Sequence, residues 1–128
     1  MDILIYCLLA AILLPYLAKM PVAYAMNQLG GYDNRQPRAQ QAKLQGFGAR
    51  ALAAHQNGFE SLIVFSAAIA TALATHHTEG LIQFLAIMHI IARVIYTAFY
   101  WLDWDKLRSL SWGLALFSSI AIIWNCIN

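Results

Sequence analysis

Glu60 and Arg93 are the two charged side chains that fall inside, or at the edge of, long apolar stretches. At 100° per residue, Arg50, Asn57 and Glu60 share one helical stripe. A second polar face, spaced i, i+4, i+7, i+8 and i+11, contains His89, Arg93, Tyr96, Thr97 and Tyr100. A guanidinium binds carboxylates and a carboxylate binds ammonium groups, so two such faces have the chemistry to hold a polar ligand or to hold each other.

Both interpretations stay open at the level of sequence. An Arg near the centre of a bilayer costs about 2.5–3.5 kcal/mol on insertion scales, and such residues face a bundle interior and find a partner. Glu60 and Arg93 can form a structural ion pair between two helices. Alternatively, the two faces converge on a ligand, since an ion pair alone does not need the amide, hydroxyl and phenol groups beside the charges.

The elements that position these residues follow from composition. Of 128 residues, 61% are hydrophobic, and only 8 Lys+Arg and 6 Asp+Glu are charged, which is 11%. Soluble domains have about 25% charged residues. Disorder, a coiled coil and a disulfide scaffold are excluded by the same figures. The net charge of +2 is too small to indicate a nucleic-acid partner.

Four segments are long and apolar enough to cross a bilayer as helices. We expect helices over about 3–26, 40–75, 81–102 and 110–127, which make one all-α, four-helix membrane domain over 1–128. Pro15 and Pro21 should bend the first helix. Ala23-Tyr24-Ala25 imitates a signal-peptidase site, but the segment has no basic start and is interrupted by Lys19, so we expect it to be retained.

Basic residues predict the orientation. Four cations lie in the first connection and two in the third, whereas the second connection, 76–80, has no Lys or Arg. These cations are Arg35, Arg38, Lys43, Arg50, Lys106 and Arg108. The positive-inside rule makes their side cytoplasmic, so both termini are expected outside the cytoplasm.

Other candidate groups have simpler explanations. Cys7 and Cys126 lie in different apolar helices without a second ligand at metal spacing, and we expect packed thiols. His76-His77 lies in a short polar turn, and we expect solvation there. No metal site is therefore predicted.

With the second and third helices laid out, the sequence resembles the MAPEG family, the membrane-associated proteins of eicosanoid and glutathione metabolism. The resemblance covers the whole chain. It rests on the stretch from Tyr32 to Arg38 (Tyr-Asp-Asn-Arg-Gln-Pro-Arg), on Asn57-x-x-Glu60, and on Arg93-x-x-Tyr96-x-x-x-Tyr100 about 33 residues later. The first of these stretches looks like the bacterial branch, which implies a bacterial inner membrane.

The resemblance implies a homotrimer that binds glutathione as co-substrate near the cytoplasmic face and takes a lipophilic substrate from the bilayer lipid. Arg50 and Arg93 would then bind carboxylates, Glu60 the ammonium group, and Asn57, Tyr96 and Tyr100 would complete the lining. Arg108 would activate the thiol, with Ser109 as a hydroxyl donor. The expected activity is that of a glutathione transferase or peroxidase.

Two departures from the family pattern bear on this expectation. Many glutathione-using members have Arg at the position of Ala53, and some have Arg at the position of Gln56. Two alternatives to an enzyme remain: a lipid-binding or scaffolding protein whose polar stripes hold a trimer together, and a small exporter. An exporter would usually have an acidic residue in its first helix, and 3–26 has none.

Overall fold

The computed structural model describes residues 1–127, and all of its regular secondary structure over that range is helical. The elements are α1 (Asp2–Leu17), α2 (Lys19–Asn27), α3 (Pro37–Gln41), α4 (Phe47–Ala74), α5 (Leu81–Trp101) and α6 (Asp105–Trp124). Four segments have the length and hydropathy of membrane spans: Asp2–Asn27, formed by α1 and α2 together, and the helices α4, α5 and α6. The predicted four-helix membrane fold is therefore confirmed.

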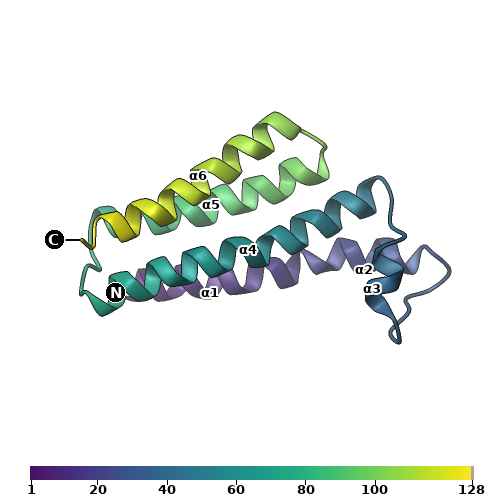
Figure 1. Cartoon of the computed structure of the whole chain (residues 1–128), viewed down its shortest axis with the longest axis horizontal. Coiled ribbons are helices and arrows are strands. Elements are labelled where there is room, and N and C mark those ends of the chain that lie inside the picture. Colours follow the sequence, from purple (N-terminus) through teal and green to yellow (C-terminus); the bar gives the residue numbers. More distant parts are fainter. Residues whose placement is uncertain (128) are drawn as a thin grey trace.

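α4 lies between two groups of helices (Figure 1). α1 and α2 run beside α4, while α5 and α6 form a hairpin on its other side, and α4 contacts all four of these helices. Met1 and the end of α6 lie at the same end of the bundle, where the Met1 ammonium is 3.5 Å from Glu79 Oε1. The two cationic connections lie together at the opposite end, as the orientation argument requires.

The first span is interrupted where the prolines predict a bend. α1 ends at Leu17 and α2 begins at Lys19, with Ala18 between them. Proline lacks the N–H that an unbroken helix needs, so Pro15 and Pro21 each remove one backbone hydrogen bond from this region. α4 holds the bend from outside, because His55 Nδ1 lies 2.6 Å from the Pro15 carbonyl oxygen.

The second helix does not begin near residue 40, as expected, but at Phe47. α3 ends at Gln41, and the chain turns through 42–46 before α4 starts. Gly46 sits at φ +56°, ψ −128°, a conformation that only glycine adopts readily, so it breaks the predicted continuous helix. The buried Gln40 fixes the preceding loop: its Nε2 donates to the carbonyls of Met26 and Gly31, at 3.1 and 2.7 Å.

The fourth helix also differs from its expected start at 110. α6 begins at Asp105, and Arg108 N–H already donates to the Trp104 carbonyl at 2.9 Å. An acidic residue in the first turn suits the positive end of the helix dipole, which explains the early start. Lys106, Arg108 and Ser109 therefore lie on a helix and not in a loop.

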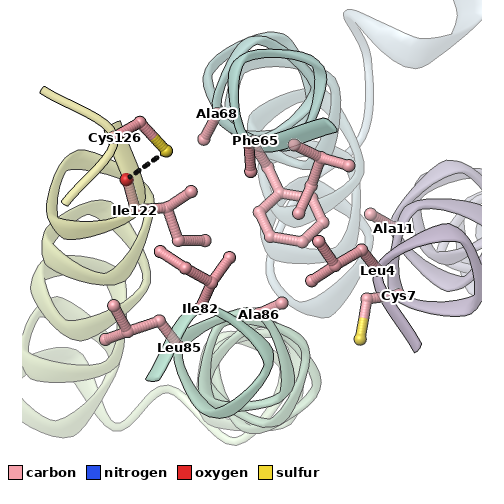
Figure 2. Close-up of a cluster of buried hydrophobic side chains, with 12 residues drawn as sticks. Leu4, Cys7, Ala11, Phe65, Ala68, Ile82, Leu85, Ala86, Ile122 and Cys126 are labelled. Atoms are coloured by element: carbon pink, nitrogen blue, oxygen red, sulfur yellow. Dashed lines mark hydrogen bonds between the residues drawn. The ribbon is translucent and has the colours of Figure 1, made fainter. Parts of the chain in front are cut away.

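The core is apolar and tightly packed (Figure 2). Phe65 and Ala68 from α4 meet Leu4 from α1 and Ile122 from α6. Small residues allow close approach of the helices, the main source of association inside lipid. The closest contact of this kind is at Gly58 of α4, where an added Cβ would lie only 2.9 Å from Pro15 Cβ.

Candidate ligand-binding site

A cavity of about 140 Å³ lies between α4, α5 and α6. Its polar lining consists of Asn57, Glu60, Ser61, His89, Arg93 and Ser119, and its apolar lining of Val64, Trp112 and Leu116. Three of the polar residues, Asn57, Glu60 and Arg93, were predicted from the sequence to belong to one site. Part of each polar face therefore meets at this cavity, as both the ion-pair and the ligand interpretation expected.

On the α4 side, Asn57 and Glu60 form one unit. They are one helical turn apart, and Asn57 Nδ2 donates to Glu60 Oε2 at 2.9 Å. Asn57 Oδ1 is buried and has no hydrogen-bond partner. Glu60 itself is exposed at the rim of the cavity. The amide therefore orients the carboxylate and keeps its own oxygen available as an acceptor.

On the α5 side, Arg93 supplies a buried positive charge. It is only 5% exposed, and its Cζ lies 4.1 Å from the centroid of the Tyr96 ring. A guanidinium over an aromatic face is attracted by the ring quadrupole, so Tyr96 holds one side of Arg93 without using its N–H groups. Arg93 Nη1 has no hydrogen-bond partner.

The ion pair between Glu60 and Arg93, which the sequence left open, is not formed. Within residues 1–127 there is one salt bridge with an N···O distance of 4.0 Å or less, and it joins the Met1 ammonium to Glu79. Glu60 and Arg93 instead line the same cavity from different helices. Two opposite charges that share a cavity without pairing can each bind an opposite charge of a ligand.

Tyr96, Tyr100 and Arg108 continue from Arg93 toward the cationic end of the bundle. The Tyr96 and Tyr100 rings meet edge to face, with centroids 5.7 Å apart. Arg108 of α6 places its Cζ 4.3 Å from the Tyr100 centroid. A continuous row of contacts between rings and guanidinium groups therefore crosses from α5 to α6 through four predicted residues: Arg93, Tyr96, Tyr100 and Arg108.

The remaining two predicted residues, Arg50 and Ser109, lie apart from the cavity. Arg50 Nη2 donates to the Trp101 carbonyl at 3.4 Å, where a cation suits the negative end of the α5 dipole. Arg50 is ten residues before Glu60 in the chain, which is about 15 Å along a helix. Ser109 is exposed on α6, and its hydroxyl has no hydrogen bond within the described residues.

Ser119 and His89 also line the cavity: Ser119 was not predicted from the sequence, and His89 was placed on the second polar face but was given no role in the site. His89 is 2% exposed and stacks on Phe65, with centroids 4.0 Å apart and ring planes 9° apart. Its Nδ1 lies 3.0 Å from the Ala115 carbonyl and 3.1 Å from Ser119 Oγ. A carbonyl only accepts, so Nδ1 carries the proton. The signal in the sequence was Ser118-Ser119 inside an otherwise apolar span.

Unpaired buried polar atoms concentrate at the predicted residues. Within residues 1–127 these side-chain atoms are Arg50 Nε, Asn57 Oδ1, Arg93 Nη1 and Trp101 Nε1. A buried donor or acceptor without a partner costs about 1–3 kcal/mol. Two of these atoms, on Asn57 and Arg93, belong to side chains that line one cavity, where a polar ligand or water would satisfy them.

The described residues contain no group of three or more His, Cys, Asp or Glu side chains arranged to hold a metal ion. Cys7 and Cys126 are free, buried thiols in different helices, and Cys126 Sγ donates to the Ile122 carbonyl at 3.1 Å (Figure 2). The polar groups that line the cavity are an arginine, a carboxylate, amide and hydroxyl groups, and an imidazole.

Fold and cavity together define an integral, multi-pass membrane protein with four spanning segments, three of which line a polar site. The family model described as MAPEG family matches residues 3–128, nearly the whole chain. The chain belongs to the MAPEG family, whose members serve glutathione and eicosanoid metabolism in membranes. Neither the curated proteins nor the solved structures give a significant match to the chain.

Proposed function

We propose that this protein is a membrane-embedded, glutathione-dependent transferase or peroxidase. The proposal rests mainly on one observation: Arg93 Nη1 and Asn57 Oδ1 are buried without hydrogen-bond partners on side chains that line one cavity, and the Glu60 carboxylate at its rim is hydrogen-bonded to Asn57 but has no ion-pair partner among the described residues. A ligand that offers a carboxylate and an ammonium group satisfies this set. Glutathione offers both, together with the thiol that the family uses.

In this proposal Arg93 binds a ligand carboxylate and Glu60 binds the ligand ammonium group. Both contacts are charge-assisted hydrogen bonds, which are about twice as strong as neutral ones. Ala53 and Gln56 supply no cation where many relatives have one, so Arg93 carries more of the carboxylate binding. Arg50 secures the end of α5 and acts on the site only indirectly.

The thiol lies, in this proposal, near Arg108, and the stack with Tyr100 fixes the direction of that guanidinium. A free thiol has a pKa of about 8.5 and becomes reactive when a nearby cation favours the thiolate. The thiolate then attacks a carbon of a lipophilic electrophile: a C–S bond forms, and the leaving group departs with its electron pair. With a hydroperoxide, the thiolate attacks one oxygen and forms an S–O bond, while the O–O bond breaks and the other fragment leaves as an alcohol after taking a proton. A second glutathione thiol then attacks the sulfur of the resulting sulfenic acid, which forms the disulfide and releases water.

An exposed seam on α4 supports assembly with further copies of the chain. Six residues spaced 4-3-4-3-4 along the helix are exposed, namely Gln56, Glu60, Ile63, Ala67, Ala70 and Ala74. This is the a/d spacing of helices that pack along one seam, and its alanines permit close approach. Glu60 lies inside the hydrocarbon core, and an exposed Glu side chain is costly against lipid, so a second copy or a water-filled space is expected there. We propose the homotrimer of the family as this assembly.

The same seam favours a second candidate function, that of a non-enzymatic, lipid-binding or scaffolding membrane protein. In that case Gln56 and Glu60 hydrogen-bond across copies, and the polar stripes serve assembly alone. Ala70→Trp should then disrupt the oligomer, with Phe84→Trp as the control, because Phe84 is 58% exposed on α5 outside the seam. Oligomer disruption alone is expected under both functions, so a binding test must separate them.

The separating experiment measures glutathione binding and conjugation of a halogenated nitroarene by the purified oligomer. The proposed enzyme binds glutathione at or below millimolar concentration and forms the conjugate. Glu60→Gln should weaken the binding while the oligomer stays intact. Intact oligomers without detectable binding at millimolar glutathione would leave the scaffolding function as the better account.

A further inference from the structure

A second, larger cavity lies between α2, α3 and α4 and has no role in the proposed reaction. Its volume is about 320 Å³, and its polar lining includes Lys19, Tyr32, Arg38, Gln41, His55 and Gln56. At 100° per residue, His55 and Phe59 lie on the opposite face of α4 from Asn57 and Ser61. The two cavities are therefore separate sites on two faces of one helix.

The charge of this second cavity is entirely positive. Lys19 and Arg38 line it, and no carboxylate does. Neither cation has an ion-pair partner, because the salt bridge of the described residues joins Met1 and Glu79 at the other end of the bundle. A lysine inside a membrane span is costly unless it reaches an interface or a partner. Lys19 is therefore a cation without an ion-pair partner within residues 1–127.

His55 adds a fixed imidazole to this lining. Its Nδ1 lies 2.6 Å from the Pro15 carbonyl oxygen, which can only accept, so Nδ1 is the donor. The other ring nitrogen, Nε2, is then left for a different partner. Gln41, Gln56 and Tyr32 supply amide and phenol donors around the same space. Two cations with several neutral donors are the set that binds phosphate oxygens.

The length of α4 places this cavity at a membrane boundary. Its 28 residues extend about 42 Å at 1.5 Å per residue, whereas the hydrocarbon core is about 30 Å thick, or about 20 helical residues. With Ala74 at the far boundary, the near boundary falls at about residue 55. Lys19, His55 and Gln56, which line the cavity together with residues of the first cationic connection, then lie at the level of lipid headgroups.

Apolar and aromatic side chains continue from the cavity along the outer surface of the first span. Phe59 lines the cavity and packs edge to face on Tyr16, with ring centroids 5.3 Å apart. Tyr16, Leu17 and Met20 are 61%, 57% and 67% exposed. Acyl chains can cover these residues, while a headgroup attached to the same molecule enters the cavity. A soluble anion has no apolar part that could contact these side chains.

We propose that this cavity binds the phosphate of an anionic phospholipid, in the leaflet on the side of the cationic connections. Lys19 and Arg38 contact the phosphate oxygens, and the amides and His55 contact the remaining polar atoms of the headgroup. The lipid is a stable ligand of the fold and takes no part in the thiol chemistry. Basic pockets between spanning helices on one side of a membrane are known binding sites for anionic headgroups.

The test compares lipid retention by native mass spectrometry after purification from nanodiscs of mixed phosphatidylglycerol and phosphatidylcholine. The intact oligomer should retain phosphatidylglycerol at least tenfold over phosphatidylcholine. Lys19→Gln combined with Arg38→Gln should abolish this preference. Arg35→Gln is the matched control, because Arg35 is an exposed cation of the same connection that does not line the cavity. Gln41→Glu, which adds a carboxylate and removes no cation, should lower the preference in the same direction.

Two outcomes overturn the proposal directly. One is equal retention of both lipids by the unmodified chain; the other is an equal loss of preference in Arg35→Gln and in the double variant. A third arm adds millimolar inorganic phosphate before the measurement. Partial competition is expected, because both anions use the same cations. Complete displacement of the retained phosphatidylglycerol would show that the acyl chains add no affinity, and the lipid assignment would then be wrong. If the double variant does not assemble, Gln41→Glu decides, and an unchanged lipid preference there contradicts the proposal.

Discussion

Arg93 lies against Tyr96, three residues later on α5, with its Cζ 4.1 Å from the ring centroid, and it forms no ion pair with Glu60. The buried arginine is thus held by an aromatic face and by its surroundings, and Nη1 keeps an unused donor. In a salt bridge, Arg93 and Glu60 would neutralise each other and neither charge would be available to a ligand. The aromatic contact leaves both available to a ligand.

The ring of Tyr96, more than its hydroxyl, should therefore matter for ligand affinity. Cation–π contacts contribute about 0.5–2 kcal/mol. Tyr96→Phe keeps the ring and should leave glutathione affinity within about twofold, whereas Tyr96→Leu should weaken it about tenfold, in line with that range. Titration calorimetry of both variants measures the difference. An equal loss in both would assign the role to the hydroxyl.

Glu60 should be required for binding of the ligand ammonium group. Hydrogen bonds to charged groups contribute about 1.5–3 kcal/mol, so Glu60→Gln should weaken glutathione binding about 10- to 100-fold. Glu79→Gln is the control, because Glu79 is an exposed acid at the other end of the bundle. A glutathione analogue without its amino group should bind the unmodified protein and Glu60→Gln with equal affinity. If the analogue still binds the unmodified protein more tightly, Glu60 does not act through the ammonium group.

Arg108 should act on the thiol and only weakly on affinity. Arg108→Gln removes the cation that favours the thiolate, so the conjugation rate should fall and its rise with pH should move to higher pH. Lys106→Gln, which removes an exposed cation two residues earlier, should leave both unchanged. The measurement is the conjugation rate at saturating glutathione over a range of pH. An unchanged pH profile in Arg108→Gln would exclude it as the activating residue.

The contact between α1 and α4 should tolerate no side chain at Gly58. Gly58→Ala places a Cβ 2.9 Å from Pro15 Cβ and 3.4 Å from Pro15 Cα, and overpacking of this kind costs about 1–3 kcal/mol. Gly113→Ala is the matched control: Gly113 is also helical, has nothing within 4 Å of an added Cβ, and its replacement should stabilise α6 by about 0.5–1 kcal/mol. Thermal unfolding in detergent should therefore shift in opposite directions for the two variants.

The sequence predicted the spans and the convergence of the polar faces well, because both depend on strong local signals. Apolar runs of about 20 residues identify spanning helices. Residues at three- and four-residue spacing share a face whatever the rest of the fold does, so Asn57 stays with Glu60 and Arg93 with Tyr96.

Three features depended on information that spacing does not contain. The break before α4 comes from the backbone of Gly46, and glycine alone does not say whether it will use its freedom. The early start of α6 comes from the preference for an acidic residue in the first turn of a helix, and this preference is one of several that decide where a helix begins. His89 joined the site because α5 and α6 pack so that Ser119 faces it, and the relative rotation of two helices is a property of their packing.

The most direct test of the central claim is a structure of the protein with glutathione bound. The account predicts a ligand carboxylate within hydrogen-bond distance of Arg93 Nη1, the ammonium group at Glu60, and the thiol on the side of Arg108. Density in this cavity that corresponds only to water or to lipid tails, at saturating glutathione and with the oligomer intact, would contradict the account.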